Sequence, residues 1–299
     1  MEIRRRSPAG PIRQLVVAGL VLCGTIVGTV VLFEESLIFF PSPWPSWLAD
    51  SGRLAVGSGR EFEDCWFETE DGLRLHGLWS RHAGEPTPRA VGDGAVVLWF
   101  HCNAGNIADR APLQLELTGP GRQVLAVDYR GYGRSRGRPT GEGVGRDATA
   151  AWRYLTGERG VPAGAVVLLG ESLGGAVAVE LAARVKPAGL VVESSFTSIR
   201  AMARQHYPFL PSGLLRTRLD PLSRIADVRC PTLFIHSTDD EIVPFSMGWR
   251  LYEAAPAPKE FLRIQGAGHN DTWAVGGAER LARIADFVAA STAPERSLP

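Results

Sequence analysis

The chain has 299 residues, of which 45% are hydrophobic and 21% are charged, a mixture that excludes a disordered chain, a collagen-like repeat and a small disulfide scaffold. Its 32 basic and 32 acidic residues give a formal charge of zero, so the basic surplus typical of a nucleic-acid-binding protein is absent. The four cysteines, Cys23, Cys65, Cys102 and Cys230, form no CxxC pair and lack metal-ligand spacing, so we expect neither a zinc site nor a disulfide framework.

The first predicted element is an apolar helix over 15–33, because this stretch contains no charged residue. Such a helix is about 28 Å long, close to the hydrocarbon thickness of a bilayer. The residues that flank it are basic before it and acidic after it: Arg4, Arg5, Arg6, Arg13, Glu34 and Glu35. By the positive-inside rule, this asymmetry predicts a single-pass membrane anchor, with a cytoplasmic basic tail over 1–14 and the rest of the chain on the exported side.

A cleaved signal peptide is the alternative interpretation of this helix, but the apolar stretch is long for one and no A-x-A-like cleavage site follows it. Residues 34–60 are predicted to form a membrane-proximal linker that contains Phe39, Phe40, Trp44 and Trp47 among prolines. These aromatic side chains fit an interfacial belt and the first layer of the next domain's core equally well, so both interpretations stay open.

Beyond residue 60, short apolar runs alternate with helical segments, which is typical of one doubly wound α/β domain, here over 61–290. The predicted strands are 64–69, 73–80, 95–101, 123–128, 165–170, 189–193, 232–236 and 260–264. The later runs lack polar alternation, as parallel strands covered on both faces do, whereas the first two have no helix between them and should form an antiparallel edge. The predicted helices are 106–118, 143–156, 173–184, 246–255 and 276–290, and a flexible tail is expected over 291–299.

Almost forty residues separate two of the predicted strands, which is longer than a plain helical crossover. We interpret residues 197–229, within this stretch, as a small apolar lid. The lid side chains predicted to bind substrate are His206, Tyr207, Phe209 and Leu210. The alternative is that the apolar side chains of the lid, with Leu214 and Leu215, only pack it against the sheet.

The motif G-x-S-x-G occurs twice, around Ser135 and around Ser172. A nucleophilic serine in this motif requires a strand that ends at the first glycine and a helix that begins after the serine. Ser172 has both, because AVVLL precedes the motif and GGAVAVELAAR continues from it. Ser135 lies in a loop rich in Gly and Arg that leads to Pro139. We therefore predict Ser172 as the catalytic nucleophile, with a simple helix N-cap as the alternative role.

An activated serine needs a general base, and the base needs an acid that orients it. His269 is the predicted base, because it lies in the glycine-rich sequence GAGHN after the last predicted strand, where an imidazole can reach over the sheet edge. We expect the other histidines to have other roles. His76 and His82 lie in early strands or loops, His206 lies in the lid and His236 ends a strand. His101 is expected to pin its loop.

Two adjacent aspartates, Asp239 and Asp240, are candidates for the acid. Asp240 is the predicted acid, because it lies three residues before Val243, which would pack beneath it, and Asp239 is interpreted as a turn residue. The resulting chain order of nucleophile, acid and base matches one known architecture. Glu193, at the end of the preceding strand, is a third candidate.

The negative charge that develops on a substrate oxygen needs preorganised N–H donors. The backbone N–H of Leu173, at the start of the helix after the nucleophile, is one predicted donor, because the positive end of the helix dipole lies there. The second predicted donor is the backbone N–H of Asn103, in the loop over 101–106. These two groups form the predicted oxyanion hole.

The motifs FHCNAGN, DYRGYGRSRGRPT, GESLGG, ESSFTS, STDDEIVPF and GAGHND, in this order, resemble the alpha/beta-hydrolase superfamily over roughly residues 33–288. The resemblance is in particular to a small membrane-anchored branch that includes serine hydrolases of acylated proteins or lipids. It implies a mostly parallel eight-stranded sheet with helices on both faces and a small lid insertion. The family usually has glycine where this chain has Cys102, which we interpret as a small apolar filler.

The leading hypothesis is therefore a serine hydrolase, a carboxylesterase or thioesterase, that cleaves an ester or thioester through an acyl-enzyme. The expected substrate is a small molecule, a lipid or an acylated protein, and no metal, cofactor or nucleic-acid partner is implied. We expect a monomer or a weak dimer. The alternatives are an amidase or peptidase of the same fold, or a catalytically silent binding protein tethered to the membrane, although the filled triad positions argue against the latter.

Overall fold

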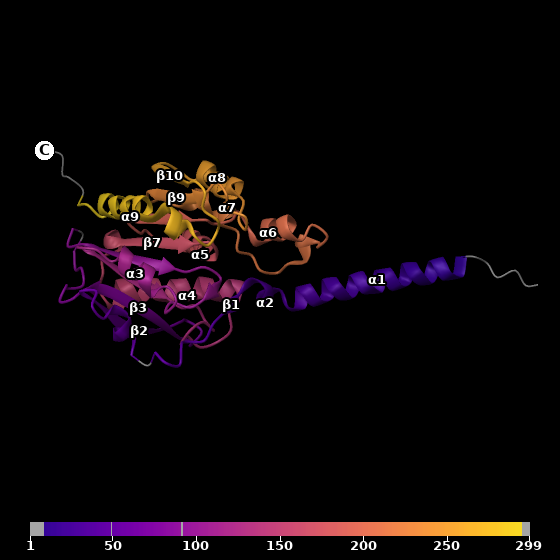
Figure 1. Ribbon diagram of the computed structural model, residues 1–299, viewed down its shortest axis with the longest axis horizontal. Coiled ribbons are helices and arrows are strands. Elements are labelled where there is room, and N and C mark those ends of the chain that lie inside the picture. The colour runs from indigo at the N-terminus through magenta and orange to yellow at the C-terminus, as the bar shows by residue number, and fades with distance from the viewer. Residues whose placement is uncertain (1–8, 49, 91, 295–299) are drawn as a thin grey trace, which may run out of the picture.

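The computed structural model describes residues 9–48, 50–90 and 92–294 (Figure 1). Arg4, Arg5 and Arg6 of the predicted basic tail, and residues 295–299 of the predicted C-terminal tail, lie outside the described residues. Figure 1 shows an α/β domain and a long helix, α1 (Ala9–Leu32), that projects from one end of it. Within the described residues, the segment Arg13–Leu32 is the one helix long and apolar enough to cross a membrane.

The domain is built on a mixed sheet of eight strands. They are β2 (Arg60–Glu68), β3 (Arg74–His82), β4 (Ala95–Phe100), β6 (Arg122–Val127), β7 (Val166–Glu171), β8 (Gly189–Glu193), β9 (Thr232–Ser237) and β10 (Lys259–Ile264). Their order across the sheet is β10-β9-β8-β7-β4-β6-β3-β2. β3 is antiparallel to both β2 and β6, and all other neighbours are parallel. The predicted strands, the antiparallel edge and the fold class are confirmed.

Helices cover both faces of this sheet. In chain order the helical elements after α1 are α2 (Glu34–Ile38), η1 (Ser51–Ala55), α3 (Ala111–Leu117), α4 (Gly141–Arg153), η2 (Tyr154–Glu158), η3 (Ala163–Ala165), α5 (Leu173–Ala182), α6 (Ile199–His206), η4 (Ser212–Leu214), α7 (Pro221–Arg224), η5 (Ile225–Asp227), α8 (Phe245–Ala254) and α9 (Thr272–Ser291). Side chains of central strand β4 alternate between two cores: Val96 and Leu98 pack with α4 and α5, whereas Val97 and Trp99 pack with α3 and α9. Both faces of β4 are therefore apolar.

Two predicted helices begin four or more residues from the expected position. α3 begins at Ala111 rather than at Asn106, because the Asn106 side chain accepts the Ala108 N–H (2.9 Å) and donates to the Pro43 carbonyl (3.0 Å), which holds a turn. α9 begins four residues early, at Thr272, and contains a kink at Gly277, whose φ of 35° is in the left-handed region.

The segment predicted as a membrane-proximal linker lies against the domain. Strand β1 (Phe40–Pro41) pairs in parallel with β5 (Ala104–Gly105), so the segment is hydrogen-bonded to the loop that follows β4. Its aromatic residues divide between the two interpretations: Phe39 is buried and Trp44 packs against the core, whereas Phe40 and Trp47 are exposed. This segment places the end of α1 beside the carboxyl end of the parallel strands.

The lid region between β8 and β9 contains α6, η4, α7 and η5. α6 begins after Ser198, whose hydroxyl oxygen accepts the Ala201 N–H (3.0 Å) as an N-cap. Figure 1 shows α6 and the loop after it at the end of the domain from which α1 projects. Of the apolar lid side chains, Leu210 and Leu215 are buried, and Tyr207, Phe209 and Leu214 are exposed.

Candidate active site

Ser172 lies on a sharp turn between β7 and α5. Its backbone has φ 54° and ψ −112°, a conformation that side-chain-bearing residues rarely adopt. The neighbouring glycines are required by space: a Cβ at Gly170 would collide with the Gly174 carbonyl, and a Cβ at Gly174 would collide with the Phe100 carbonyl. The turn is held by the Ser172 N–H, which donates to the Glu193 carbonyl at 2.8 Å. The strained turn points the serine hydroxyl away from the sheet's hydrogen-bond network.

Ser135, the serine of the second G-x-S-x-G sequence, has a different environment. Its hydroxyl donates to the Asp128 carbonyl (2.8 Å) and accepts the His76 N–H (2.9 Å), and the side chain is buried. The Ser135 hydroxyl therefore both donates and accepts a hydrogen bond, and these two bonds fix the loop after β6 to β3.

The structure brings Ser172, His269 and Asp240 together in one hydrogen-bonded series. His269 Nε2 lies 3.0 Å from Ser172 Oγ, and His269 Nδ1 lies 2.8 Å from Asp240 Oδ2. The other Asp240 oxygen, Oδ1, accepts the N–H groups of Ile242 (3.0 Å) and Val243 (2.7 Å), which fixes the carboxylate. The His269 loop is held by its own N–H, which donates to Glu241 Oε2 at 3.0 Å.

The pKa shifts of Asp240 and His269 agree with the hydrogen bond between them. Burial raises the pKa of Asp240, but hydrogen bonds from His236 and His269 outweigh that effect and hold the pKa below its usual value. Burial lowers the pKa of His269, but the hydrogen bond and charge of Asp240 outweigh it, so the net pKa lies above 6.5. An ionised Asp240 can only accept, so Nδ1 of His269 carries a proton and, in the neutral imidazole, Nε2 accepts from Ser172.

The two other candidates for the acid, Asp239 and Glu193, bond groups other than His269. Asp239 is exposed and accepts the Gly266 N–H (2.8 Å) and the Thr238 hydroxyl (2.8 Å), which stabilises the turn after β9. Glu193 is fully buried and accepts from Thr272 Oγ1 (3.0 Å) and from the Arg280 guanidinium. Each carboxylate is thus used by a partner other than His269.

The two predicted oxyanion donors line the same pocket as Ser172 and His269. Leu173 is the first residue of α5, where a backbone N–H has no acceptor within the helix. The Asn103 loop is held from three sides: its Nδ2 donates to the Ile38 carbonyl (2.9 Å), and its carbonyl accepts the Phe40 N–H (2.9 Å) and the Tyr132 hydroxyl (2.7 Å). Both donors are therefore on rigid backbone.

Cys102, for which the resemblance implies a glycine, is buried beside Asn103. Cys102 does not have a positive φ, so its backbone conformation is one that a cysteine adopts without strain. Its sulfur accepts from Arg110 Nη2 at 2.9 Å, and the same nitrogen lies 3.3 Å from the Ala104 carbonyl. Sequence reasoning missed Arg110, because its contact with the loop depends on the turn before α3.

The His101 side chain hydrogen-bonds and packs with groups other than Ser172, His269 and Asp240. Its Nδ1 donates to the Cys102 carbonyl (2.7 Å), and its Nε2 lies 3.5 Å from the buried carboxylate of Asp128. The ring packs against Tyr129 and Tyr132. Through these contacts His101 holds the loop at Cys102 in place.

A cavity of about 820 Å³, here called the Ser172 pocket, is lined by Ser172 and His269. The lid residues predicted to bind substrate all line it: His206, Tyr207, Phe209 and Leu210. Its wall also includes Ile26 and Val30 of α1 and Leu37 and Ile38 of α2, which sequence reasoning did not place there. Most of the lining side chains are apolar. Among the described residues, no cluster of three or more His, Cys, Asp or Glu side chains could hold a metal ion.

Comparison with known proteins identifies the class. A family model described as serine aminopeptidase, S33 (Hydrolase_4) matches residues 93–217. The uncharacterised protein Rv2307c of Mycobacterium tuberculosis is 39% identical over 268 residues, which cover 88% of this chain and 91% of that protein. The alpha/beta hydrolase domain-containing protein WAV2 of Arabidopsis thaliana is 32% identical over 282 residues, which cover 87% of this chain and 88% of that protein.

Solved structures agree with these sequence relatives on the fold. The Pyrococcus furiosus esterase Pf2001 superposes with a TM-score of 0.66 at 21% identity, over 85% of this chain and 98% of that one. An acetyl xylan esterase from Paenibacillus sp. R4 superposes with a TM-score of 0.60 at 18% identity, over 79% of this chain and 85% of that one. The chain belongs to the alpha/beta-hydrolase superfamily.

Proposed function

We propose that this protein is a membrane-anchored serine hydrolase that cleaves a carboxylic ester or thioester through an acyl-enzyme. The observation that carries the proposal is the series from Ser172 through His269 to Asp240, with distances of 3.0 and 2.8 Å; Ser172 and His269 line a mostly apolar pocket. A silent binding protein would have no need of the strained turn at Ser172, which costs on the order of 1–3 kcal/mol.

In the proposed reaction, Ser172 Oγ attacks the acyl carbon while His269 Nε2 takes the hydroxyl proton. Asp240 holds the imidazole in the required tautomer and stabilises the imidazolium. The N–H groups of Leu173 and Asn103 donate to the oxyanion of the tetrahedral intermediate. His269 then returns the proton to the departing alcohol or thiol, which leaves the acyl group on Ser172. Water, deprotonated by the same imidazole, releases the acid and restores the serine.

The proposed substrate carries a medium or long acyl chain, as a lipid, an acylated protein or a small acyl ester does. The Ser172 pocket supports this class, because its lid wall is built from apolar side chains such as Phe209 and Leu210. Each buried CH₂ contributes about 0.8 kcal/mol, so an apolar pocket of this size favours longer chains by severalfold per methylene.

We further propose that residues 15–33 form a single membrane span, with the N-terminus in the cytoplasm and the hydrolase domain, over 61–290, on the exported side. Residues Arg13–Leu32 form a helix about 30 Å long whose most apolar stretch is unburied, as lipid exposure requires. Protease protection in sealed vesicles tests the orientation: the domain should be digested only when the exported face is accessible. Digestion from the cytoplasmic face would reverse the proposed topology.

A peptidase of the same fold is the second candidate, because the matching family model is described as a serine aminopeptidase. An aminopeptidase needs an anion for the substrate's terminal ammonium. Among the described residues that line the Ser172 pocket, the one carboxylate is Glu34, and both its oxygens already accept from Arg216 and Thr217. This lining favours an uncharged acyl group over a peptide N-terminus.

A hydrolysis series on the full chain in detergent micelles tests the proposal. p-Nitrophenyl esters from acetate to palmitate are compared with the p-nitroanilide of the preferred acyl chain and with aminoacyl anilides. We expect kcat/KM to rise from acetate to medium or long chains and the anilides to be poor substrates. A fall in kcat/KM beyond butyrate would remove the long-acyl proposal, and preferred cleavage of aminoacyl anilides would select the peptidase.

A further inference from the structure

Glu34 is a buried carboxylate at the point where the long apolar helix enters the domain. It is the first residue of α2, and its side chain is 3% exposed, whereas its neighbour Glu35 is exposed. Flanking acidic residues after a membrane span ordinarily face water, because burying an unpaired carboxylate is costly. A buried position for Glu34 therefore requires specific partners.

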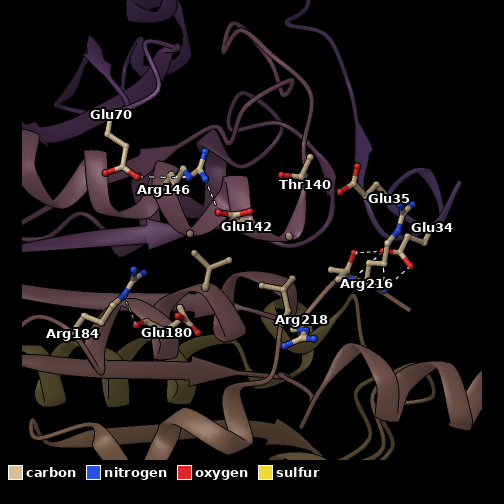
Figure 2. Close-up of a pocket in the computed structure, with 15 residues that line it drawn as sticks. Glu34, Glu35, Glu70, Thr140, Glu142, Arg146, Glu180, Arg184, Arg216 and Arg218 are labelled. Atoms are coloured by element: carbon tan, nitrogen blue, oxygen red, sulfur yellow. Dashed lines mark hydrogen bonds and ion pairs between the residues drawn. The ribbon is translucent and has the colours of Figure 1, made fainter. Parts of the chain in front are cut away.

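Those partners all belong to the lid. Glu34 Oε2 accepts the Arg216 N–H at 2.9 Å, and Oε1 accepts the Thr217 N–H at 2.9 Å and the Thr217 hydroxyl at 3.0 Å. Arg216 also reaches back to α1, where its Nη2 donates to the Val31 carbonyl at 2.8 Å. Glu34 and Arg216 line a second, charged cavity of about 830 Å³, here called the charged hollow. Figure 2 shows the two side chains close together at one side of it. Glu34 thus joins the lid to α2, and Arg216 joins it to the last turn of α1.

The same junction borders the Ser172 pocket, since Glu34 lines both cavities. On the anchor side the pocket wall includes Ile26 and Val30, one helical turn apart on α1, and Leu37 and Ile38 on α2. Leu215 of the lid also lines the pocket, and it directly precedes Arg216, whose N–H is bonded to Glu34. The charged hollow beyond Glu34 is lined mainly by glutamate and arginine side chains, so it offers an acyl chain less apolar surface than the Ser172 pocket does.

We propose that the last turns of α1 form the distal wall of an acyl-chain site, and that Glu34 is the positioning residue that holds the lid against this wall. On this proposal, which rests on the proposed function, the helix does more than tether the enzyme. Ile26 and Val30 contact the end of a long acyl chain whose carbonyl lies at Ser172. The helix thereby determines which chain lengths are accepted, and a chain extending past Ile26 would enter the surrounding lipid.

The first test fills the wall. Ile26→Trp in the full chain is compared with Val21→Trp, an exposed position on the same helix about 140° around its axis from Ile26, outside the pocket wall. The measurement is the ratio of kcat/KM for p-nitrophenyl palmitate to that for the butyrate, in detergent micelles. Ile26→Trp should lower the ratio at least about tenfold, the loss of two methylene contacts at roughly fourfold each. Val21→Trp should leave the ratio within twofold.

The second test loosens the junction. Glu34→Gln is compared with Glu35→Gln, its exposed neighbour, and folding is checked by the thermal unfolding midpoint. Glu34→Gln should raise KM for palmitate severalfold more than for butyrate, whereas Glu35→Gln should change neither. If Glu34→Gln does not fold, the Ile26→Trp comparison alone decides.

Equal ratios in Ile26→Trp, Val21→Trp and wild type would overturn the proposal, as would an equal loss at every chain length in a folded Glu34→Gln variant. A third outcome concerns the reaction itself. If folded wild-type protein neither hydrolyses any ester nor reacts with a fluorophosphonate at Ser172, the proposed function fails, and the acyl-chain site fails with it.

Discussion

His269 Nε2 lies 3.0 Å from Ser172 Oγ, although 97 residues separate the two in the chain. β7 delivers the serine from the middle of the sheet, and the loop after the edge strand β10 carries the histidine across β8 and β9 to meet it. The hydrogen bond therefore depends on the whole parallel half of the sheet, and the proposed chemistry depends on that one contact.

Ser172→Ala and His269→Ala should each lower kcat by orders of magnitude, up to about 10⁶, because each removes a partner in the same proton transfer. The double variant should be hardly worse than either single one. Ester hydrolysis under saturating substrate measures the effect. Additive losses in the double variant would show that the two residues do not act as a unit.

Ser135→Ala is the control for the second G-x-S-x-G sequence. It removes a hydroxyl that bonds the Asp128 carbonyl and the His76 N–H, so it should lower the free energy of unfolding by about 1–3 kcal/mol while most activity remains. Urea unfolding and the ester assay measure the two effects. An inactive but folded Ser135→Ala variant alongside an active Ser172→Ala variant would reverse the assignment of the nucleophile.

Asp240→Asn should reduce kcat far more than Asp239→Asn, because only Asp240 contacts His269 Nδ1. An amide at position 240 can present a donor to Nδ1 and so favour the wrong tautomer, which costs about 10⁴ in a comparable triad. Asp239→Asn should weaken only the turn bonds from Gly266 and Thr238. Equal, mild losses in both variants would instead point to Glu193, although Arg280 already occupies that carboxylate.

The activity should rise with pH through a single group whose midpoint lies above 6.5. His269 must be neutral to accept the serine proton, and the Asp240 charge raises its pKa above the usual value despite burial. A folded-state pKa above the unfolded one means that this imidazole stabilises the fold fully below about pH 6.5, and that the stabilisation is lost as the pH rises through the higher folded pKa. The pH profile of kcat/KM measures the midpoint, which should move down in Asp240→Asn; an unchanged midpoint would assign the titration elsewhere.

Cys102→Gly should retain or raise activity if Cys102 only fills the place of a glycine, as the sequence predicts; its backbone is outside the left-handed region. The variant loses the contact between the sulfur and Arg110, so Cys102→Ser, which keeps an acceptor, is the matched control. Comparison of kcat in the three proteins decides. A large fall in kcat for a folded Cys102→Gly variant that Cys102→Ser does not show would assign the Arg110 contact a role in shaping the oxyanion loop.

What the sequence predicts well here is local. The strand before Ser172, the helix after it and the two glycines all lie within ten residues of Ser172, so the turn and its serine follow from the pattern. The Glu34 junction could not be predicted, since its partners, Arg216 and Thr217, lie more than 180 residues away and pair through their backbone N–H groups. The place of Ile26 in the pocket wall could not be predicted either, because every face of the helix around it is apolar and the sequence does not show which face contacts the domain.

The most direct test of the account is covalent labelling of the full chain with a fluorophosphonate, followed by peptide mass spectrometry. The probe reacts with a serine only where a base activates it. The account predicts phosphonylation of Ser172, none in Ser172→Ala, and strongly slowed labelling in His269→Ala. Folded protein that remains unlabelled, or labelling that falls on Ser135 and persists in Ser172→Ala, would contradict it.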